Sequence, residues 1–235
     1  LESFNYNEFD ITGYLRDGEN EIRAHVYYQG LNNRVWISRD NRMGLIAEVV
    51  RPDGEVILFT DESWECARIA GYLPARSFGE RVQFQEHYDS RIPMDDYVPV
   101  SVRKHNDVVM ADAPTRPLMM YEAVPEVQKT LPDNSRFYDF GTEITATLRI
   151  TATGKTGDQI RILCGEETDD SEYGVRYMTR CNCAYEDSWI LNGIDTTFEQ
   201  FDYKAFRYVC LVPSDPDIRI DRVVAVVRHG EFDDG

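Results

Sequence analysis

The chain lacks any long hydrophobic run. None of its apolar stretches approaches the ~20 residues that a membrane-spanning helix needs. Residues 1–8 also lack the basic start and apolar stretch of a secretory signal. Because residue 1 is Leu rather than Met, we expect the sequence to be a segment of a longer protein, whose own start can still carry a leader.

Basic residues are scarce relative to acidic ones. The 235 residues include 25 Lys and Arg against 42 Asp and Glu, which gives a net charge of −17. Such a surface repels phosphate backbones and anionic lipid headgroups, so it argues against nucleic-acid and membrane partners. The charge is compatible with a neutral ligand such as a carbohydrate, and equally with solubility alone.

Cysteine and histidine are also few. Five cysteines are an odd number, so at least one has no partner within the chain, which favours a reducing compartment such as the cytoplasm. The Cys181-Asn182-Cys183 motif would need two more zinc ligands, and the four His are scattered singly. An acidic loop at 166–172 could bind calcium but lacks EF-hand spacing. No cofactor is therefore predicted, with calcium left as the alternative.

Strand patterns and turn signals dominate the chain. Residues 144–151 alternate apolar side chains with Thr or Arg, which places one face of a strand on a core and the other in water. Residues 219–227 are apolar enough for both faces to be covered over part of their length. Turn signals such as those at 132–134 and 154–157 separate these runs, and no helical stripe persists. We predict an all-β protein with two antiparallel β-sandwich (jelly-roll-like) domains and little helix.

Proline marks the boundary between the two predicted domains. Five of the ten prolines lie within residues 93–125. Proline cannot donate to a strand ladder, so this segment is expected to be a connection with at most an edge strand. The predicted domains cover residues 1–115 and 116–235.

Ordered motifs in both halves resemble one family. In the second half they are Phe137–Gly141, Gly154–Ile160, Cys164–Glu167, Tyr185–Leu191 and Phe201–Val209. In the first half they are Phe9–Thr12 with Leu15, Gly18–Asn20, Thr60–Trp64 and Glu86–Arg91. The second half resembles the β-sandwich just upstream of the catalytic barrel in bacterial α-L-rhamnosidases. The first half resembles that family's N-terminal jelly-roll domain, which is similar to galactose-binding folds. That domain usually has strands before the first motif, so the first sandwich of this chain is expected to be incomplete.

The resemblance implies that the catalytic residues lie elsewhere. In that family the acid and base sit in an (α/α)6 barrel after the second sandwich, where this sequence ends. The adjacent pairs Glu166-Glu167 and Asp169-Asp170 would point to opposite faces of a strand, and no Gly-x-Ser-x-Gly nucleophile motif occurs. No catalytic residue is predicted. The expected partners are the barrel of the same polypeptide and, through the parent α-L-rhamnosidase, a rhamnose-containing glycan.

One loop has the composition of a sugar site. Sugars present apolar C–H faces and hydroxyl edges, so their sites combine an aromatic ring with amide, carboxylate or guanidinium groups. The candidates are Tyr28, Asn32, Asn33, Arg34 and Trp36. The alternative is that the two aromatic residues are ordinary core and that the Asn residues stabilise turns.

Two arginines are predicted to be structural. Arg91 is expected to pair with an acidic neighbour such as Asp89, and Arg207 is expected to be a buried partner for Glu166 or Asp139.

Three classes of function remain open. An accessory part of a glycoside hydrolase predicts a large exposed apolar surface where the barrel or missing strands would pack. An independent sugar-binding, lectin-like module predicts a compact cleft with an aromatic ring and several polar groups. A structural or interaction sandwich unrelated to sugar predicts neither feature.

Overall fold

The computed structural model of the chain describes residues 3–27, 43–73, 85–103, 109–116, 118–169, 171–179, 183–194 and 196–232. Within these ranges every regular element is a β-strand except the 3-10 helix η1 (Thr12–Tyr14). The prediction of an all-β fold with little helix is confirmed. No helix in these ranges is long and apolar enough to cross a membrane.

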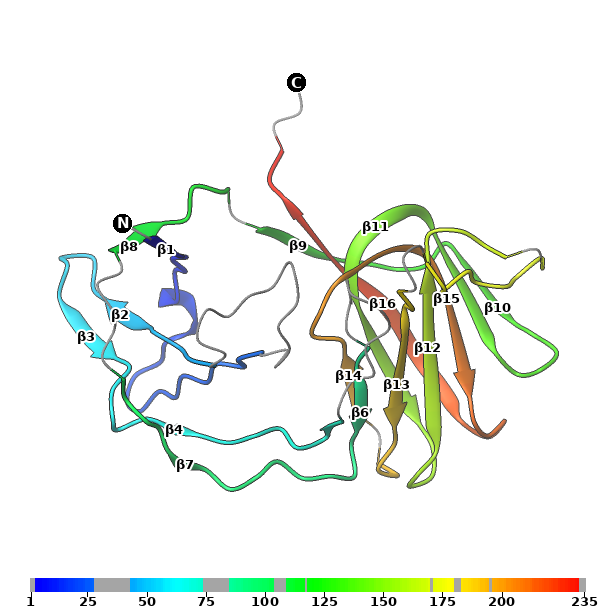
Figure 1. Cartoon of the computed structure of the whole chain (residues 1–235), viewed down its shortest axis with the longest axis horizontal. Helices are drawn as coiled ribbons and strands as arrows, with labels where there is room; N and C mark the ends of the chain where they lie inside the picture. Colours follow the sequence, from blue (N-terminus) through cyan, green and yellow to red (C-terminus); the bar gives the residue numbers. More distant parts are fainter. Residues whose placement is uncertain are drawn as a thin grey trace.

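One sheet of ten strands dominates the structure (Figure 1). Its order is β5 (Tyr72–Leu73), β6 (His87–Asp89), β13 (Glu186–Ile190), β12 (Gln159–Gly165), β15 (Lys204–Pro213), β11 (Arg136–Thr153), β16 (Arg219–Gly230) and β9 (Leu118–Ala123). Two further strands, β10 (Val127–Thr130) and β14 (Thr196–Glu199), also pair with β11. Apart from the parallel β6–β13 pair, all these strand pairs are antiparallel.

The long strand β11 folds this sheet into a sandwich. Its first part pairs with β10 and β15, whereas its second part pairs with β14 and β16. The register shifts between Asp139 and Ile144, and Gly141 there has φ +78°. The positive φ favours glycine, because other residues are strained in this backbone conformation. The strand can therefore bend, and Figure 1 shows it arching over the sandwich.

The core lies between the two layers that β11 connects. Ala146, Leu148 and Ile150 are fully buried, as the alternation predicts, and they pack with Trp189 and Phe206. Burying a large apolar side chain contributes roughly 1.5–3 kcal/mol to stability. Residues 223–227 of β16 are all buried, so the prediction that this strand is covered on both faces is confirmed.

The first half of the chain is built differently. Its described residues form three two-stranded pairs: β1 (Ser3–Tyr6) with β8 (Val109–Asp112), β2 (Glu48–Val50) with β3 (Val56–Phe59), and β4 (Glu65–Cys66) with β7 (Val98–Pro99). All four side chains of β3 are exposed. Among the described residues, every buried apolar side chain except Pro125 belongs to position 137 or later. The buried apolar core therefore comes from the second half, and the half-buried Tyr88 of the first half packs against it.

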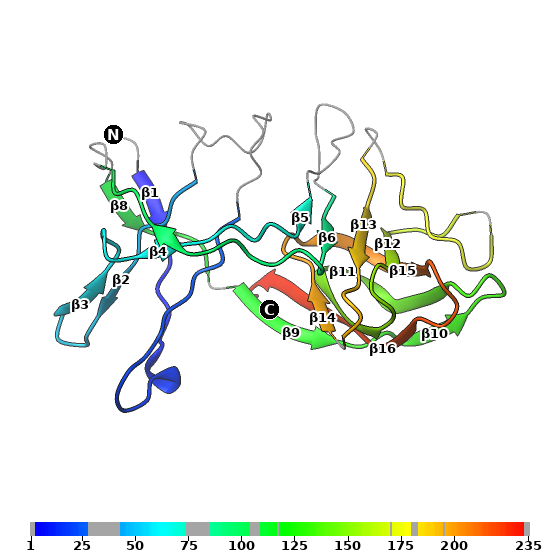
Figure 2. The ribbon, with the colours of Figure 1, turned by 90° about the horizontal axis from the view of Figure 1, so that it is seen from below.

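Part of the first half nevertheless joins the large sheet. Strands β5 and β6 extend its edge, where β6 runs parallel to β13 (Figure 2). Trp189 Nε1 donates a hydrogen bond to Ser90 Oγ over 2.7 Å. The predicted first domain thus contributes two strands to the sheet of the second.

Candidate functional site

The predicted sugar-binding residues Tyr28, Asn32, Asn33, Arg34 and Trp36 lie outside the described residues. The hypothesis that this loop binds a sugar therefore stays a prediction.

Arg207 joins two strands of the sandwich through Asp139. Its Nε and Nη2 donate to the two carboxylate oxygens of Asp139 over 2.8 and 2.9 Å, and Asp139 also accepts the N–H of Gly141. These hydrogen bonds hold the pKa of Asp139 below its usual value. Glu166, the other predicted partner, is exposed on the surface. The Arg207 side chain is 37% exposed, so the expectation of a buried arginine is wrong.

Arg91 pairs with Asp89 at the seam between the halves. Its Nε and Nη2 donate to the Asp89 carboxylate over 2.8 and 2.7 Å, and its backbone N–H donates to the same group. Asp89 is buried while Arg91 is half-exposed, so the pair closes the end of β6 at the surface.

A buried charged cluster, absent from the predictions, joins the same seam to the core. Lys204 Nζ lies 2.8 Å from Oδ2 of Asp187, and both side chains are fully buried. Asp187 Oδ1 accepts the backbone N–H of Glu86, whose own carboxylate accepts the N–H groups of Phe201 and Asp202. The cluster formed by Glu86, Asp187 and Lys204 therefore connects β6, β13 and β15.

Gln200 completes the polar contacts around this cluster. Its side chain donates to Asp187 and accepts the backbone N–H of Leu148 over 2.8 Å. The sequence held a signal for the cluster, because successive side chains of a strand alternate between faces. Asp187 lies two residues before the core residue Trp189, and Lys204 two residues before Phe206.

Glu86 has one property of a catalytic acid but no access to a substrate. Burial raises its pKa to about 7, while Lys204 opposes that shift. Perturbed carboxyl groups are common at active sites, although structural ion pairs perturb them too. Both carboxylate oxygens already accept backbone hydrogen bonds, and the residue is buried. We therefore interpret the cluster as structural.

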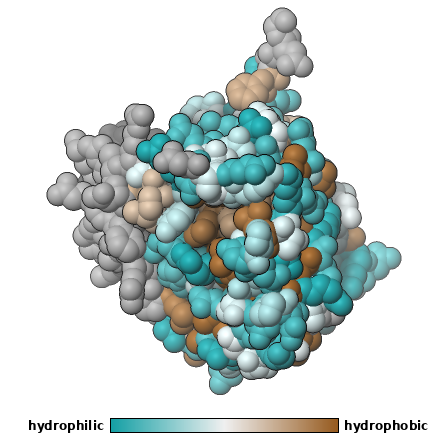
Figure 3. Space-filling model, turned by 90° about the vertical axis from the view of Figure 1, so that its right-hand side faces the viewer, coloured by the Kyte–Doolittle hydropathy of each residue, from teal (hydrophilic) through white to brown (hydrophobic). Residues whose placement is uncertain are grey.

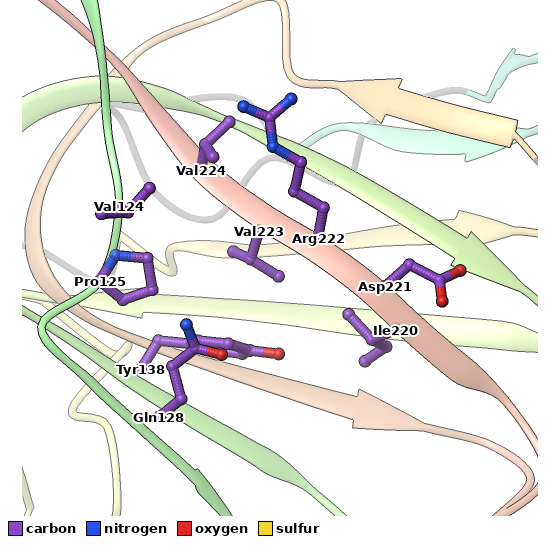
Figure 4. Close-up of a pocket in the computed structure, with 9 residues that line it drawn as sticks. All are labelled: Val124, Pro125, Gln128, Tyr138, Ile220, Asp221, Arg222, Val223 and Val224. Carbon is purple, nitrogen blue, oxygen red and sulfur yellow. The ribbon is translucent and has the colours of Figure 1, made fainter.

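A small pocket opens where β9 leaves the sheet (Figure 4). After Ala123 the chain bends through Val124 and Pro125 towards β10. Among the described strands, β16 then has a neighbour on one edge only, from Arg219 to Val224. The cavity at this place has a volume of about 150 Å³.

The pocket combines apolar walls with neutral polar groups. Val124, Pro125 and Ile220 line it together with the ring of Tyr138, which is only 5% exposed. Gln128 lies directly across from Tyr138 in the β10–β11 pair, so both side chains stand on one face. Burial raises the pKa of Tyr138 to about 12, so its hydroxyl stays protonated at neutral pH and can both donate and accept.

The charges at this pocket are paired outside it. Arg222 Nη2 donates to Glu122, and Figure 4 shows the guanidinium directed away from Tyr138. Asp221 Oδ1 accepts a 2.6 Å bond from Arg219 Nε. Each charge is thus balanced locally. In the part of the chain that the structure describes, no three His, Cys, Asp or Glu side chains gather closely enough to hold a metal ion.

The fold and its polar contacts define a β-sandwich of the concanavalin-like type with a second β-rich segment attached to its edge. The model of the α-L-rhamnosidase N-terminal domain matches residues 2–130, and that of the bacterial α-L-rhamnosidase concanavalin-like domain matches residues 129–229. The chain belongs to the α-L-rhamnosidase family and corresponds to its N-terminal domains. No protein with a curated description matches it.

Three solved structures with the same fold are much longer than this chain. The chain is 21% identical to an α-L-rhamnosidase from Dictyoglumus thermophilum, with a TM-score of 0.56 over 77% of this chain and 21% of that one. It is 22% identical to an α-L-rhamnosidase from Aspergillus terreus, with a TM-score of 0.54 over 79% of this chain and 22% of that one. It is 20% identical to an α-L-rhamnosidase from Streptomyces avermitilis complexed with L-rhamnose, with a TM-score of 0.56 over 78% of this chain and 19% of that one. This chain therefore spans about a fifth of the length of these three structures.

Proposed function

We propose that this chain is a non-catalytic β-sandwich region that supports the catalytic barrel of an α-L-rhamnosidase within one polypeptide. The parent protein would act on a rhamnose-containing glycan. The observation that carries the proposal is the contrast between a complete core in residues 118–230 and apolar side chains left uncovered next to it.

The uncovered side chains of β9 form the clearest such surface. Leu118, Met119, Met120 and Tyr121 are all at least 45% exposed. Successive residues point to opposite faces, so neither face of this strand is covered. In Figure 1, β9 and the end of β16 extend away from the sandwich.

Other parts of the surface are different. On the side of the sandwich that Figure 3 shows, most residues are hydrophilic and hydrophobic ones form small patches. A group of exposed apolar residues on one strand is typical of a protein–protein contact. This supports the view that another part of the parent protein packs on β9.

The first test is whether the chain cleaves a sugar. We expect no release of nitrophenol from p-nitrophenyl α-L-rhamnoside by the 235-residue chain, whereas the parent protein should hydrolyse it. Measurable turnover by the chain alone, retained after repurification, would contradict the proposal.

The second test concerns β9. Met120→Glu should leave the melting temperature of this chain unchanged, because the side chain is 55% exposed here, but should lower that of the parent protein. Ile194→Glu is the matched control, since Ile194 is an exposed apolar residue in the turn between β13 and β14. Equal effects of the two substitutions in the parent would argue against packing on β9.

A further inference from the structure

We propose that the pocket between Val124–Gln128 and β16 binds one neutral sugar ring. This is a site on the sandwich itself, and its lining residues are other than those of the predicted loop around Trp36. It does not depend on the supporting role proposed above.

The size of the pocket limits the ligand. Pockets for drug-sized molecules begin at ~300 Å³, and a cavity of ~150 Å³ accommodates a molecule as small as benzene. The volume of about 150 Å³ found here therefore suits a single six-membered ring and excludes an enclosed oligosaccharide.

The lining matches the two kinds of surface that a sugar presents. The Tyr138 ring, Pro125 and Ile220 offer apolar contact for C–H groups. The Tyr138 hydroxyl and the Gln128 amide make no hydrogen bond with another residue that the structure describes, so both can serve a ligand hydroxyl. The edge of β16 from Ile220 to Val224 adds backbone N–H and C=O groups, since β9 pairs only from Ala225 onwards.

The charges favour a neutral ligand over an ion. Arg222 is engaged by Glu122 and Asp221 by Arg219, so neither needs a counterion from a ligand. A neutral sugar adds no charge to the pocket, and its hydroxyls can bond to the neutral Tyr138 hydroxyl and Gln128 amide.

Direct binding to the 235-residue chain tests the inference. The probes are L-rhamnose, L-fucose, D-glucose and D-galactose. Each is titrated to about 50 mM, well above a millimolar Kd, and binding is followed by saturation-transfer NMR. We expect at least one sugar to bind with a millimolar Kd. If none binds, the inference is overturned.

Three substitutions then locate the binding. Tyr138→Phe removes only the hydroxyl, Gln128→Leu removes the amide from an exposed position, and Val124→Trp fills the mouth at an exposed residue. Each should weaken binding at least about fivefold while the melting temperature stays close to that of the unchanged chain, and Gln159→Leu, outside the pocket, should leave affinity unchanged.

Trp36→Ala separates the two sugar sites under consideration. Binding that survives Trp36→Ala and is lost in the pocket variants supports the pocket. Binding that is lost in Trp36→Ala and unaffected by Gln128→Leu and Val124→Trp would assign the sugar to the loop and overturn the pocket.

Discussion

The two halves of this chain contain similar strand-forming residues but use them differently. In residues 118–230 the strands form one bent sheet, and their apolar faces meet in a core. In residues 3–116 most strands pair only two by two, and side chains such as those of β3 stay exposed. An apolar strand therefore adds to a core only when a second layer covers it.

The segment 85–91 is the exception within the first half. It joins the large sheet through β6, and its Glu86 enters the buried cluster with Asp187 and Lys204. Both β6 and β3 are short strands. They differ in their partners, since β6 pairs with β13 of the large sheet and β3 pairs with β2.

The largest effect is expected from Lys204→Met. The substitution would leave Asp187 and Glu86 in the core without their cation, and breaking a buried ion pair typically costs about 3–5 kcal/mol. Chemical denaturation followed by Trp fluorescence measures the free energy of unfolding. Lys155→Met, which removes an exposed lysine that pairs with Asp215 and Asp217, is the control and should change the free energy of unfolding little. Equal losses would show that the cluster contributes no more than a surface pair.

The contrast between the halves can be measured by comparing the loss of stability from an Ile→Ala substitution in each half. Ile150→Ala should destabilise the chain by about 2–5 kcal/mol, because Ile150 is fully buried in the core. Ile57→Ala should change stability by no more than ~0.5 kcal/mol, because Ile57 is 48% exposed. Differential scanning calorimetry of both variants would compare them directly. A large loss from Ile57→Ala would mean that β3 is covered in solution.

Glu86 should make stability fall as pH rises. Its pKa is raised from 4.5 to about 7 in the folded chain, so between these values the folded state holds a proton that the unfolded state has released. The stabilisation is full below about pH 4.5 and is lost as the pH rises to about 7, by an amount on the order of 3 kcal/mol.

Glu86→Gln isolates this contribution. The difference in free energy of unfolding between the variant and the unchanged chain should vary across pH 4.5–7 and be constant above it. A difference independent of pH throughout that range would mean that Glu86 titrates as an ordinary surface carboxyl group.

The smallest effect is expected from Arg207→Ala. The bidentate pair with Asp139 joins β15 to β11, but solvent reaches the 37% exposed arginine and screens it. We therefore expect a small but measurable loss in the free energy of unfolding, below that from Lys204→Met or Ile150→Ala. Asp139→Asn should cost a similar amount, and the double variant should cost less than the sum. Strict additivity in this cycle would show that the two side chains do not stabilise each other.

Several elements of the second half could be predicted from local patterns. The alternation over 144–151 identified the inward residues of β11, and the turn signals at 132–134 and 154–157 correspond to the connections of β11 with β10 and β12. Period-two alternation and turn chemistry depend on neighbouring residues only. For the same reason, the pattern left the partner of Arg207 open between Glu166 and Asp139, because that choice depends on which strands pair.

The sequence by itself determined the all-β class, the inward face of β11 and membership of the α-L-rhamnosidase family. Tertiary structure alone decided that β5 and β6 extend the sheet of the other half, that Glu86 meets Lys204 across more than a hundred residues, and that a pocket opens beside Tyr138. The physical reason is that strand periodicity is set by adjacent residues, whereas buried charges and cavities arise where segments distant in sequence pack together.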